Sequence, residues 1–352
     1  MSEQLRVAYD MTFPNRNAGG SGVYATELLS QLRRRDDVAV RVVALDGASG
    51  WSRTVPWLVG GAQRAAADAQ VMHCPALVAP WRLRAPLVLT IHDVSTWRYP
   101  QGHRLEWQAY ARWLLPARAR SAAAVITGTQ YTKKEIVDSL GVRPERIAVT
   151  PYGVPARYLS ATPAARPVGD PPQVLFPSPP IQRKNLELVL QAMAQAPRDS
   201  ALSRARLSIT GARADGFPEQ VKRVKVLGLE NRVQWRGKVP ADDMPGVFAA
   251  ADLVVYPSFH EGFGFPALEA MATGTPVVAS NAACLPEVLG DAALLVDPLS
   301  PGGLIAAAES ALTDQKKRCE LIERGRARAA QFTWERCANL TVDVYRQAIA
   351  QT

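Results

Sequence analysis

The stretch Ser258–Ser280, SFHEGFGFPALEAMATGTPVVAS, decides how the rest of this chain can be interpreted. The apolar, β-forming run Leu253–Tyr256 precedes it, and strong helix formers follow a turn rich in glycine and proline. This order predicts a buried strand, a loop and a helix, with another strand at Pro276–Ala279. Glu261 then lies in the loop, and Glu269 lies one turn inside the helix.

The turn between the two glutamates suits an anionic ligand that carries many hydroxyl groups. Gly262 and Gly264 let the backbone approach a ligand closely, and the N–H groups at a helix start favour an anion. Glu261 and Glu269 would accept hydrogen bonds from sugar hydroxyls rather than contact the phosphate. The spacing alone is equally compatible with a buried strand, loop and helix in which one glutamate is solvated and the other caps the helix.

Length and composition predict two domains with cores of their own. The chain has 352 residues, of which 47% are hydrophobic. No apolar run approaches the roughly 20 residues that span a bilayer, and the first residues, MSEQLRVAYD, lack the features of a signal peptide, so we expect a cytoplasmic protein. The cysteines are scattered without a CxxC pair, which argues against a disulfide framework or a zinc site.

The positive charge is concentrated in the first half of the chain. Residues 1–160 hold 20 Lys and Arg against 12 Asp and Glu, whereas residues 161–352 hold 21 against 20. A basic face there could meet anionic lipid, a phosphorylated acceptor or nucleic acid. An arginine-rich surface without a partner explains the count equally well.

A glycine-rich loop follows the first expected strand, Leu5–Tyr9. Gly20 and Gly22 fit the dinucleotide-binding pattern G-x-G-x-x-A, but a loop of nine residues, 10–18, separates them from the strand. In the dinucleotide fold the first glycine follows the strand immediately. We therefore expect a longer loop that reaches toward a partner domain, with Gly22 allowing close backbone approach at the start of the helix Tyr24–Arg33.

His92 is the histidine best placed for function. It follows the expected strand Leu87–Ile91, and open α/β sheets bind ligands at the carboxyl ends of their strands. A lone histidine is also commonly a hydrogen-bonded structural group.

The segment Arg104–Leu115 predicts a basic, aromatic helix with Trp107, Tyr110 and Leu114 on one face. This face could dock on a membrane surface or an acceptor, but packing in the core is the more economical interpretation. Three arginines would then lie near lipid headgroups: Arg112, Arg118 and Arg120.

Strands and helices alternate through both halves of the chain. The proline-rich segment Pro155–Pro172 interrupts the pattern and predicts a linker. We therefore expect an α/β protein with two doubly wound, Rossmann-like domains across a cleft, 1–160 and 161–333, with the helix 334–352 packing back on the first.

These motifs together resemble one family of enzymes. The matching segments are Gly19–Tyr24 (GGSGVY), His92–Ser95 (HDVS), Arg183–Leu186 (RKNL), Gly237–Pro240 (GKVP) and Glu261–Ala272 (EGFGFPALEAMA). The chain resembles the retaining nucleotide-sugar glycosyltransferases of family 4, with their two-domain GT-B architecture, and is similar to mannosyltransferase-like bacterial members. The last segment is the family's E-x7-E motif, and the match spans nearly the whole length.

The resemblance implies roles for the residues of the E-x7-E motif. Glu269 would hold the ribose hydroxyls of the donor. Glu261 would grip the donor sugar and the distal phosphate, together with the backbone amides of Gly262, Phe263 and Gly264.

It also implies roles outside that motif. Arg183 and Lys184 would neutralise the diphosphate, which the glycine loop of Gly20 and Gly22 would reach through the Gly22 amide. Family members often carry another arginine five residues before the lysine, where this chain has Pro179, so Arg183 would take over that charge. The remaining matched positions are Lys238 and Val239, which would contact the base, and His92, near the transferring sugar.

The implied reaction moves a hexose of the mannose or glucose type, from a donor such as GDP-mannose or UDP-glucose, to a hydroxyl group of a glycan, lipid-linked or small-molecule acceptor, with retention of configuration. No D-x-D triplet occurs in the sequence, so we expect neither a metal nor another cofactor. Nucleic acid is not an expected partner, whereas peripheral membrane contact is. A sugar-nucleotide epimerase or phosphorylase of related fold, a nicotinamide-dependent oxidoreductase and a non-catalytic binding module remain alternatives.

Overall fold

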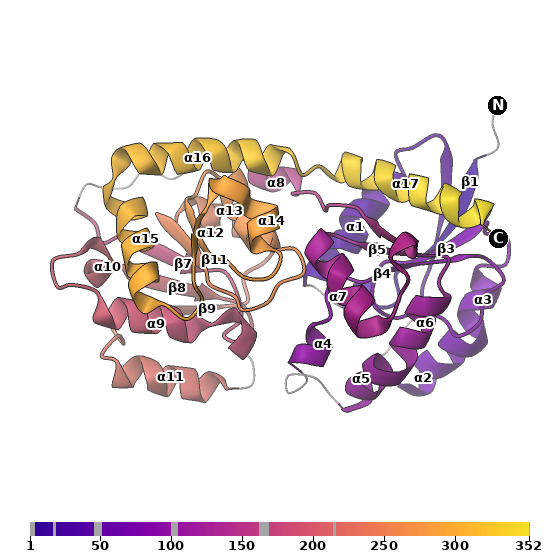
Figure 1. The fold of residues 1–352 in the computed structure, drawn as a ribbon, viewed down its shortest axis with the longest axis horizontal. Helices are drawn as coiled ribbons and strands as arrows, with labels where there is room; N and C mark the ends of the chain where they lie inside the picture. Colours follow the sequence, from indigo (N-terminus) through magenta and orange to yellow (C-terminus); the bar gives the residue numbers. More distant parts are fainter. Residues whose placement is uncertain are drawn as a thin grey trace. The chain divides into compact units, whose positions relative to one another are not determined.

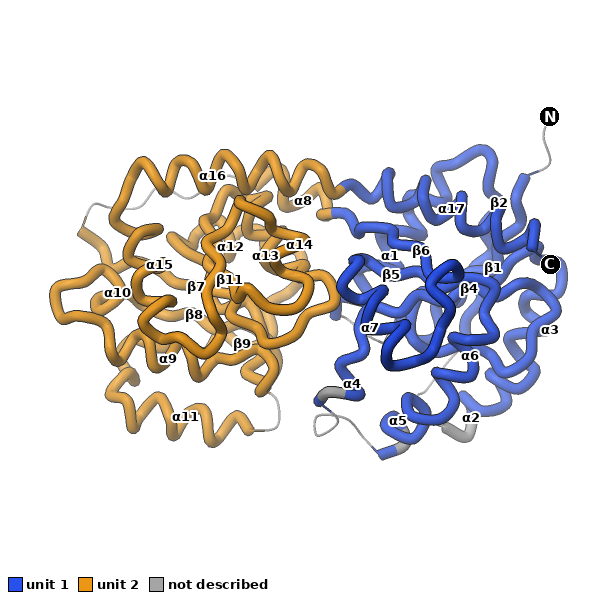
Figure 2. Tube along the Cα trace, viewed as in Figure 1, with its two compact units in different colours: residues 1–153, 333–352 blue, residues 154–332 orange. Residues whose placement is uncertain are grey.

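The computed structural model describes residues 4–16, 19–45, 51–99, 105–161, 169–213 and 216–351. Within it the chain forms two compact units, which Figure 2 distinguishes by colour. Unit 1 contains residues 1–153 and 333–352, and unit 2 contains residues 154–332. The chain therefore enters unit 2 seven residues before the boundary expected from the sequence, and the helix 334–350 belongs to unit 1.

Unit 1 is built on a six-stranded parallel sheet with the order β2-β1-β3-β4-β5-β6. Its strands are β1 Leu5–Asp10, β2 Val38–Val43, β3 Val71–Cys74, β4 Leu87–Thr90, β5 Ala124–Thr127 and β6 Ile147–Val149. Strands β3, β4 and β5 have four residues each, and all of these residues are buried, as expected for a parallel sheet covered on both faces.

The helices of unit 1 cover that sheet (Figure 1). They are α1 Gly20–Leu32, α2 Trp51–Pro56, α3 Ala62–Ala65, α4 Ser95–Arg98, α5 Leu105–Ala109, α6 Leu115–Ser121, α7 Gln130–Leu140 and α17 Trp334–Ala350, with π-helical turns at Trp57–Gly61 and Tyr110–Leu114 and 3-10 turns at Pro14–Arg16 and Pro144–Arg146. Helix α17 packs against α1 and against β3, β4 and β5. Its Tyr345 hydroxyl lies 2.6 Å from Nδ1 of His73 in the buried sheet, which fixes the helix to the unit.

The aromatic face of the segment 104–115 packs inward, as the more economical interpretation of the sequence predicted, and not toward a membrane. Tyr110 is buried, and Trp107 and Leu114 pack against the core of unit 1. The opposite side of the same helical segment exposes Leu105 and Trp113. Arg104, the first residue of the expected helix, lies outside the described residues.

Unit 2 contains a second six-stranded parallel sheet, with the order β12-β11-β10-β7-β8-β9. Its strands are β7 Gln173–Phe176, β8 Arg206–Thr210, β9 Val233–Gly237, β10 Leu253–Tyr256, β11 Val277–Ser280 and β12 Leu294–Val296. Its helices are α8 Ala156–Leu159, α9 Leu186–Gln195, α10 Ala201–Arg204, α11 Phe217–Val226, α12 Met244–Ala249, α13 Phe265–Ala272, α14 Leu285–Leu289, α15 Pro301–Thr313 and α16 Gln315–Ala330, with 3-10 turns at Gln182–Lys184 and Gly290–Ala292. Helices α8, α12 and α16 pack around α13, whereas α15 packs with α9 and α10.

The linker expected at Pro155–Pro172 is only partly irregular. Helix α8 lies inside it, and its Tyr158 is buried against unit 2. Pro155 has an extended backbone and occupies the N-cap position of α8. The proline that suggested a linker therefore immediately precedes an ordered helix. Residues 162–168 of the expected linker lie outside the described residues.

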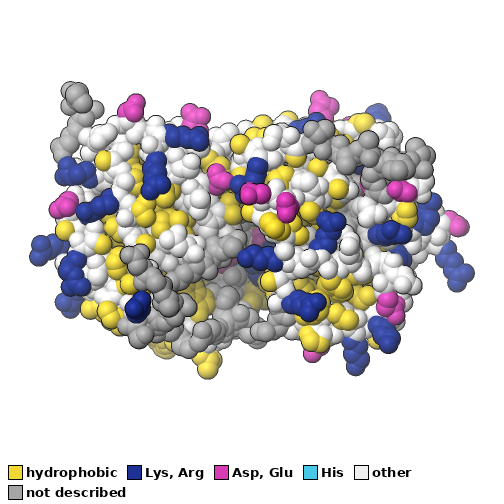
Figure 3. Space-filling model, turned by 180° about the vertical axis from the view of Figure 1, so that it is seen from behind, with side chains coloured by type: hydrophobic (Ala, Val, Ile, Leu, Met, Phe, Trp, Pro, Cys, Tyr) yellow, Lys and Arg dark blue, Asp and Glu magenta, His cyan; other side chains and the backbone are white. Residues whose placement is uncertain are grey.

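The positive charge does not form one patch on the face shown in Figure 3, where Lys and Arg side chains are scattered over both units. The excess of Lys and Arg over Asp and Glu in the first half of the sequence therefore does not form a single basic surface on this side of the molecule.

Candidate active site

The two central strands of unit 2 place the candidate site. The chain runs outward through β7, β8 and β9 and then returns to β10 on the other side of β7. The order of strands thus reverses between β7 and β10, and open α/β sheets bind ligands outside the carboxyl ends of strands at such a point. The loop after β7 carries Arg183 and Lys184, and the loop after β10 carries Glu261.

These two loops bring opposite charges together. The Lys184 ammonium donates to Glu261 Oε1 at 2.5 Å and to the Tyr256 hydroxyl at 2.9 Å. Arg183 Nη1 lies 3.4 Å from Glu261 Oε2 and 3.2 Å from the carbonyl oxygen of His260. Both members of the Lys184–Glu261 pair are 7% exposed.

Backbone contacts hold the two loops in register. The Phe259 amide donates to the carbonyl of Arg183 at 2.9 Å. Asn185 has a left-handed backbone, with φ of 59°, and its side-chain amide donates to the carbonyls of Pro257 and Pro298. This residue therefore ties together the loops that follow β7, β10 and β12 and positions the lysine that precedes it.

The charges of this cluster leave a net positive site. Burial alone would raise the pKa of Glu261, but Lys184 and Arg183 outweigh it and lower that pKa to about 2. At neutral pH, one carboxylate faces two cations. The cluster can therefore accept further negative charge, as the oxygens of a phosphate would supply.

The turn that precedes α13 requires glycine at its last position. Gly264 has φ of +90°, and a Cβ there would lie 2.7 Å from Cδ2 of Leu285. Phe263 is buried beside Phe265 and Phe332, with ring centroids 5.1 and 5.7 Å apart. The buried Phe263 side chain thus anchors the turn, and Gly262 and Gly264 carry no side chain that would cover its backbone.

Glu269 lies in a different environment from Glu261. It is buried on α13, which packs against α8, the helix that carries the buried Tyr158. Burial raises the pKa of Glu269 to about 7, although the charge of Arg157 and the nearby Tyr158 hydroxyl both act to lower it. The pKa of Glu261 is therefore lowered, and that of Glu269 raised, from the ordinary value of a glutamate.

Lys238 and Val239 follow the end of β9, a strand at the edge of the sheet. Gly237, with φ of +68°, turns the chain, and its carbonyl accepts from the Gly211 amide at 2.8 Å. Lys238 is exposed and Val239 is half-buried. Their backbone thus lies at the carboxyl end of unit 2's sheet, on the far side of β8 from Lys184.

The glycine loop of unit 1 starts helix α1 directly. The helix begins at Gly20, and the amide of Gly22 donates to the carbonyl of Gly19 at 2.9 Å. The amide that the family resemblance assigns to the diphosphate is therefore engaged within the first helical turn. Nine residues, 11–19, separate β1 from α1; residues 14–16 of this connection form a 3-10 turn, and residues 17 and 18 lie outside the described residues.

His92 is fully hydrogen-bonded within unit 1. Its Nε2 lies 3.0 Å from the carbonyl oxygen of Pro75, which can only accept, so Nε2 carries the proton. Nδ1 then accepts from the Tyr152 hydroxyl at 3.0 Å. Burial lowers the pKa of His92, which agrees with a neutral ring. The imidazole is thus fixed in one tautomer and is a poor proton acceptor.

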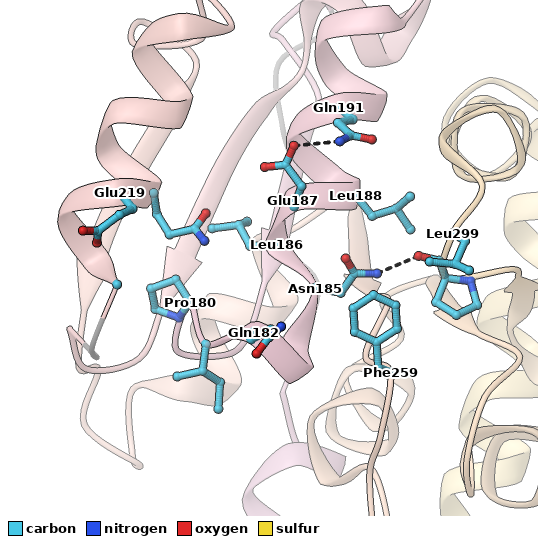
Figure 4. A pocket seen from close by; sticks show the side chains of 14 residues that line it. Pro180, Gln182, Asn185, Leu186, Glu187, Leu188, Gln191, Glu219, Phe259 and Leu299 are labelled. Carbon is cyan, nitrogen blue, oxygen red and sulfur yellow. Dashed lines mark hydrogen bonds between the residues drawn. The ribbon is translucent and has the colours of Figure 1, made fainter. Parts of the chain in front are cut away.

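A pocket of about 460 Å³ opens beside the charged cluster in unit 2 (Figure 4). Gln182 and Asn185, on either side of the Arg183–Lys184 pair, line it together with Phe259. Glu187 and Gln191 of α9 hydrogen-bond to each other on its wall. Arg183 and Lys184 are not among the residues that line this pocket, and both contact Glu261.

The structure thus assembles Arg183, Lys184 and Glu261 into one cluster. Tyr256, which contacts Lys184, and Tyr158, which lies near Glu269, were not expected from the sequence. Tyr256 ends the predicted strand, which is where ligand-binding side chains occur in such sheets, so its position was an available signal. Tyr158 gave no such signal because it falls in the segment interpreted as a linker.

Among the described residues, no three histidine, cysteine, aspartate or glutamate side chains are grouped so as to hold a metal ion. No helix in the described part of the chain has the length and apolarity that crossing a membrane requires.

Comparison with known proteins identifies the family. The family model described as "Glycosyltransferase Family 4" matches residues 53–158, and the model "Glycosyl transferases group 1" matches residues 163–328. O-antigen chain mannosyltransferase B of Escherichia coli is 34% identical over 285 residues, which cover 78% of this chain and 74% of that protein.

Solved structures share the fold. Sucrose-phosphate synthase from Thermosynechococcus elongatus superposes with a TM-score of 0.81 at 21% identity, covering 99% of this chain and 100% of that one. HepE of Anabaena, solved in complex with UDP-glucose, gives a TM-score of 0.73 at 21% identity and covers 98% of each chain. The chain therefore belongs to glycosyltransferase family 4, has the GT-B fold, and is a glycosyltransferase.

Proposed function

We propose that this glycosyltransferase moves a hexose from a nucleoside-diphosphate sugar to a hydroxyl acceptor, with retention of configuration and without a metal ion. The observation that carries the proposal is the cluster of the half-buried Arg183 with the buried Lys184 and Glu261 at the strand reversal of unit 2. Its net positive charge suits the diphosphate, and its carboxylate suits the hydroxyls of a sugar.

The cluster would act on the leaving group. When the bond between the anomeric carbon and the diphosphate oxygen breaks, negative charge grows on that oxygen. Lys184 and Arg183 stabilise this charge because they are already fixed at the site and need no reorganisation. The acceptor hydroxyl forms the new bond on the same face, and its proton passes to a phosphate oxygen. Glu261 positions the sugar rather than forming a covalent bond to it.

The nucleotide would occupy the remaining predicted positions. Glu269 accepts hydrogen bonds from the ribose hydroxyls, and the backbone at Lys238 and Val239 contacts the base. The amides of Gly262, Phe263 and Gly264 hold the distal phosphate. Gly20 and Gly22 would approach the diphosphate from unit 1, with the Gly22 amide leaving the Gly19 carbonyl when they do so.

His92 would lie near the transferring sugar as a neutral ring. Its two nitrogens are engaged by Tyr152 and Pro75, so it orients its surroundings and does not exchange a proton during transfer. A donor of the mannose or glucose type agrees with the mannosyltransferase similar to this chain and with the neighbour solved with UDP-glucose.

A panel of sugar nucleotides tests the donor assignment. The true donor, present at 100 times its dissociation constant, should stabilise the protein by about 2.7 kcal/mol. Transfer should persist in EDTA, and complete loss there would overturn the metal-free mechanism. Donor turnover with and without a hydroxyl acceptor distinguishes transfer from epimerisation or phosphorolysis.

We also propose a peripheral contact with anionic lipid through the exposed side of the segment 105–121. Leu105 is 79% exposed and Trp113 is 71% exposed, and the Arg112 guanidinium lies 5.7 Å from the Trp113 ring centroid. Apolar side chains beside a cation suit the headgroup region of a bilayer. Trp113→Ala should reduce co-sedimentation with anionic vesicles while leaving soluble-acceptor transfer unchanged, and equal binding of both proteins would contradict the contact.

A further inference from the structure

The pocket of about 460 Å³ in unit 2 has no part in the proposed transfer. Its volume falls within the roughly 300–1,000 Å³ of pockets that hold small molecules. None of the residues assigned above to the donor lines it. Figure 4 shows Glu219 of α11 toward one end of the pocket and Leu299 toward the other, with the first turns of α9 between them. The pocket is therefore distinct from the positions proposed for the donor.

The charges around the pocket argue against an anionic ligand. None of the described residues that line it is a lysine, arginine or histidine, whereas two are glutamates, Glu187 and Glu219. Glu187 is already paired with Arg223, whose Nη2 lies 2.6 Å from its Oε1. A phosphate or a nucleotide would thus meet a carboxylate and no cation on this wall. The pocket suits a neutral ligand instead.

Side-chain amides give the wall both donors and acceptors of hydrogen bonds. Four of them line the pocket: Gln182, Asn185, Gln191 and Gln220. Asn185 donates its amide hydrogens to the carbonyls of Pro257 and Pro298, which leaves its oxygen for a ligand. Gln191 donates one hydrogen to Glu187 at 2.7 Å, which leaves its oxygen and its second hydrogen. A sugar hydroxyl both donates and accepts, so this mixed wall matches it.

Gln220 supplies an independent indication of a polar ligand. Its Oε1 is buried and has no hydrogen-bond partner in the part of the chain that the structure describes. Buried polar atoms are nearly always hydrogen-bonded, because an unpartnered one has lost its bonds to water. The terminal torsion of a glutamine is soft, so a ligand hydroxyl that reaches Gln220 can supply the donor. This oxygen therefore favours a ligand that carries hydroxyl groups over a purely apolar one.

Apolar side chains complete the wall. Leu186 and Leu188 are buried, Phe259 is half-buried, and Leu299 is 76% exposed. A sugar ring carries its hydroxyls at the edge and has C–H groups on its faces, which pack on such a surface. The Phe259 amide donates to the carbonyl of Arg183 at 2.9 Å, so the loop that carries this ring is already fixed. Few polar groups on a fixed apolar wall are typical of a small-molecule site.

We propose that this pocket is a carbohydrate-binding site, which takes one neutral sugar residue of a glycan with its hydroxyls on the amides and a C–H face on Phe259. The site goes beyond the proposed function, because the sugar it holds does not react. It is built on the two loops that carry the charged cluster, since Gln182 precedes Arg183 and Phe259 lies two residues before Glu261. A glycan held there is anchored to the unit proposed to bind the donor.

Saturation-transfer NMR of the full chain with mannobiose and maltose tests the site. At least one disaccharide should bind, with the strongest saturation on the C–H protons of one ring, and neither UDP nor GDP should displace it. Gln191→Leu and Gln220→Leu each remove an amide at similar volume and should weaken binding about fivefold, which is the loss of one hydrogen bond. The double variant should weaken binding about 25-fold if the two bonds are independent.

Gln195→Leu is the matched control, because it removes an exposed amide from the same helix outside the pocket and should leave binding unchanged. Glu219→Gln removes the charge and keeps the hydrogen-bonding capacity, so sugar binding should change little. Binding of putrescine instead of either sugar, lost in Glu219→Gln, would overturn the proposal in favour of a cation site. Wild-type sugar affinity in the double variant, or no sugar binding by the wild type, would also overturn it. Failure to bind UDP or GDP would count against the proposed function and leave this site unaffected.

Discussion

Lys184 and Glu261 are 77 positions apart in the chain, and their charged groups meet at 2.5 Å in the interior of unit 2. Without a ligand, each charge compensates the other. A diphosphate that arrives at this pair finds a lysine already oriented, because Tyr256 holds the same ammonium from the end of the neighbouring strand. The pair therefore serves both the stability of the unit and the chemistry proposed for it.

Lys184→Ala should destabilise the protein by about 3 kcal/mol, because it leaves the Glu261 carboxylate buried with only the longer contact to Arg183. Transfer should be abolished. Denaturant unfolding and a transfer assay measure the two effects, and adding Glu261→Gln to Lys184→Ala should restore most of the stability but no activity.

The exposed pair of Arg223 and Glu187 supplies the control for that experiment. Its side chains are 37% and 39% exposed, so water already solvates both charges and Arg223→Ala should leave unfolding close to wild type. Wild-type transfer rates in Lys184→Ala would remove the diphosphate role from Lys184.

Glu269 should make stability depend on pH in the opposite sense from most carboxylates. Its pKa rises from the ordinary 4.5 to about 7 on folding, so the folded state binds the proton more tightly. The resulting stabilisation is present below pH 4.5 and is lost as the pH rises through 7. Relative to Glu269→Gln, the wild type should therefore lose about 3 kcal/mol of unfolding free energy across that interval. Parallel stability curves for the two proteins would contradict the raised pKa.

Glu269→Ala should raise the donor KM more than it lowers kcat. The carboxylate contacts the ribose in the proposed complex and not the bond that breaks, so its loss weakens ground state and transition state together. Steady-state kinetics over a range of donor concentrations measures the split. A large fall in kcat at saturating donor would assign Glu269 to the chemical step instead.

Gly264→Ala should destabilise unit 2 by at least about 2 kcal/mol. The residue needs a left-handed backbone, which costs an L-residue roughly 1–2 kcal/mol, and the new Cβ would press on Leu285. Gly228→Ala isolates the cost of the left-handed backbone, because Gly228 has φ of +67° and a Cβ added there would have no neighbouring atom within 4 Å. Gly302→Ala, in the open first turn of α15, should be neutral or slightly stabilising. Equal unfolding free energies for the Gly264 and Gly228 variants would show that the Leu285 contact relaxes without cost.

The strands that bracket the candidate site were predictable from local sequence. Leu253–Tyr256 forms β10 as expected, and the second strand lies at Val277–Ser280, one residue later than predicted. Runs of β-branched and apolar residues between glycine and proline leave few other structures available. The helix after the turn begins at Phe265, because Gly264 supplies the left-handed residue that precedes it.

Long-range pairing was not predictable in the same way. Nothing local to Lys184 shows that it meets Glu261, because that contact depends on β7 and β10 being neighbours in the sheet. The family resemblance assigned both residues to a donor but did not pair them. Tyr158 was missed for a related reason, since α8 has only four residues and its packing against α13 cannot be read from the local sequence. The roles given to individual site residues remain predictions.

The assignment of α17 to unit 1 has a consequence for the order in which the two units can be completed during synthesis. Unit 1 begins with the first strand, yet it lacks the helix that packs on β3, β4 and β5 until residues beyond 332 leave the ribosome. Unit 2, residues 154–332, is continuous and is complete at that moment. At about 5–20 residues per second, its synthesis takes roughly 10–40 seconds, during which His73 has no Tyr345 to bind. The unit that starts first therefore finishes last, because its helix α17 is the last helix to be made.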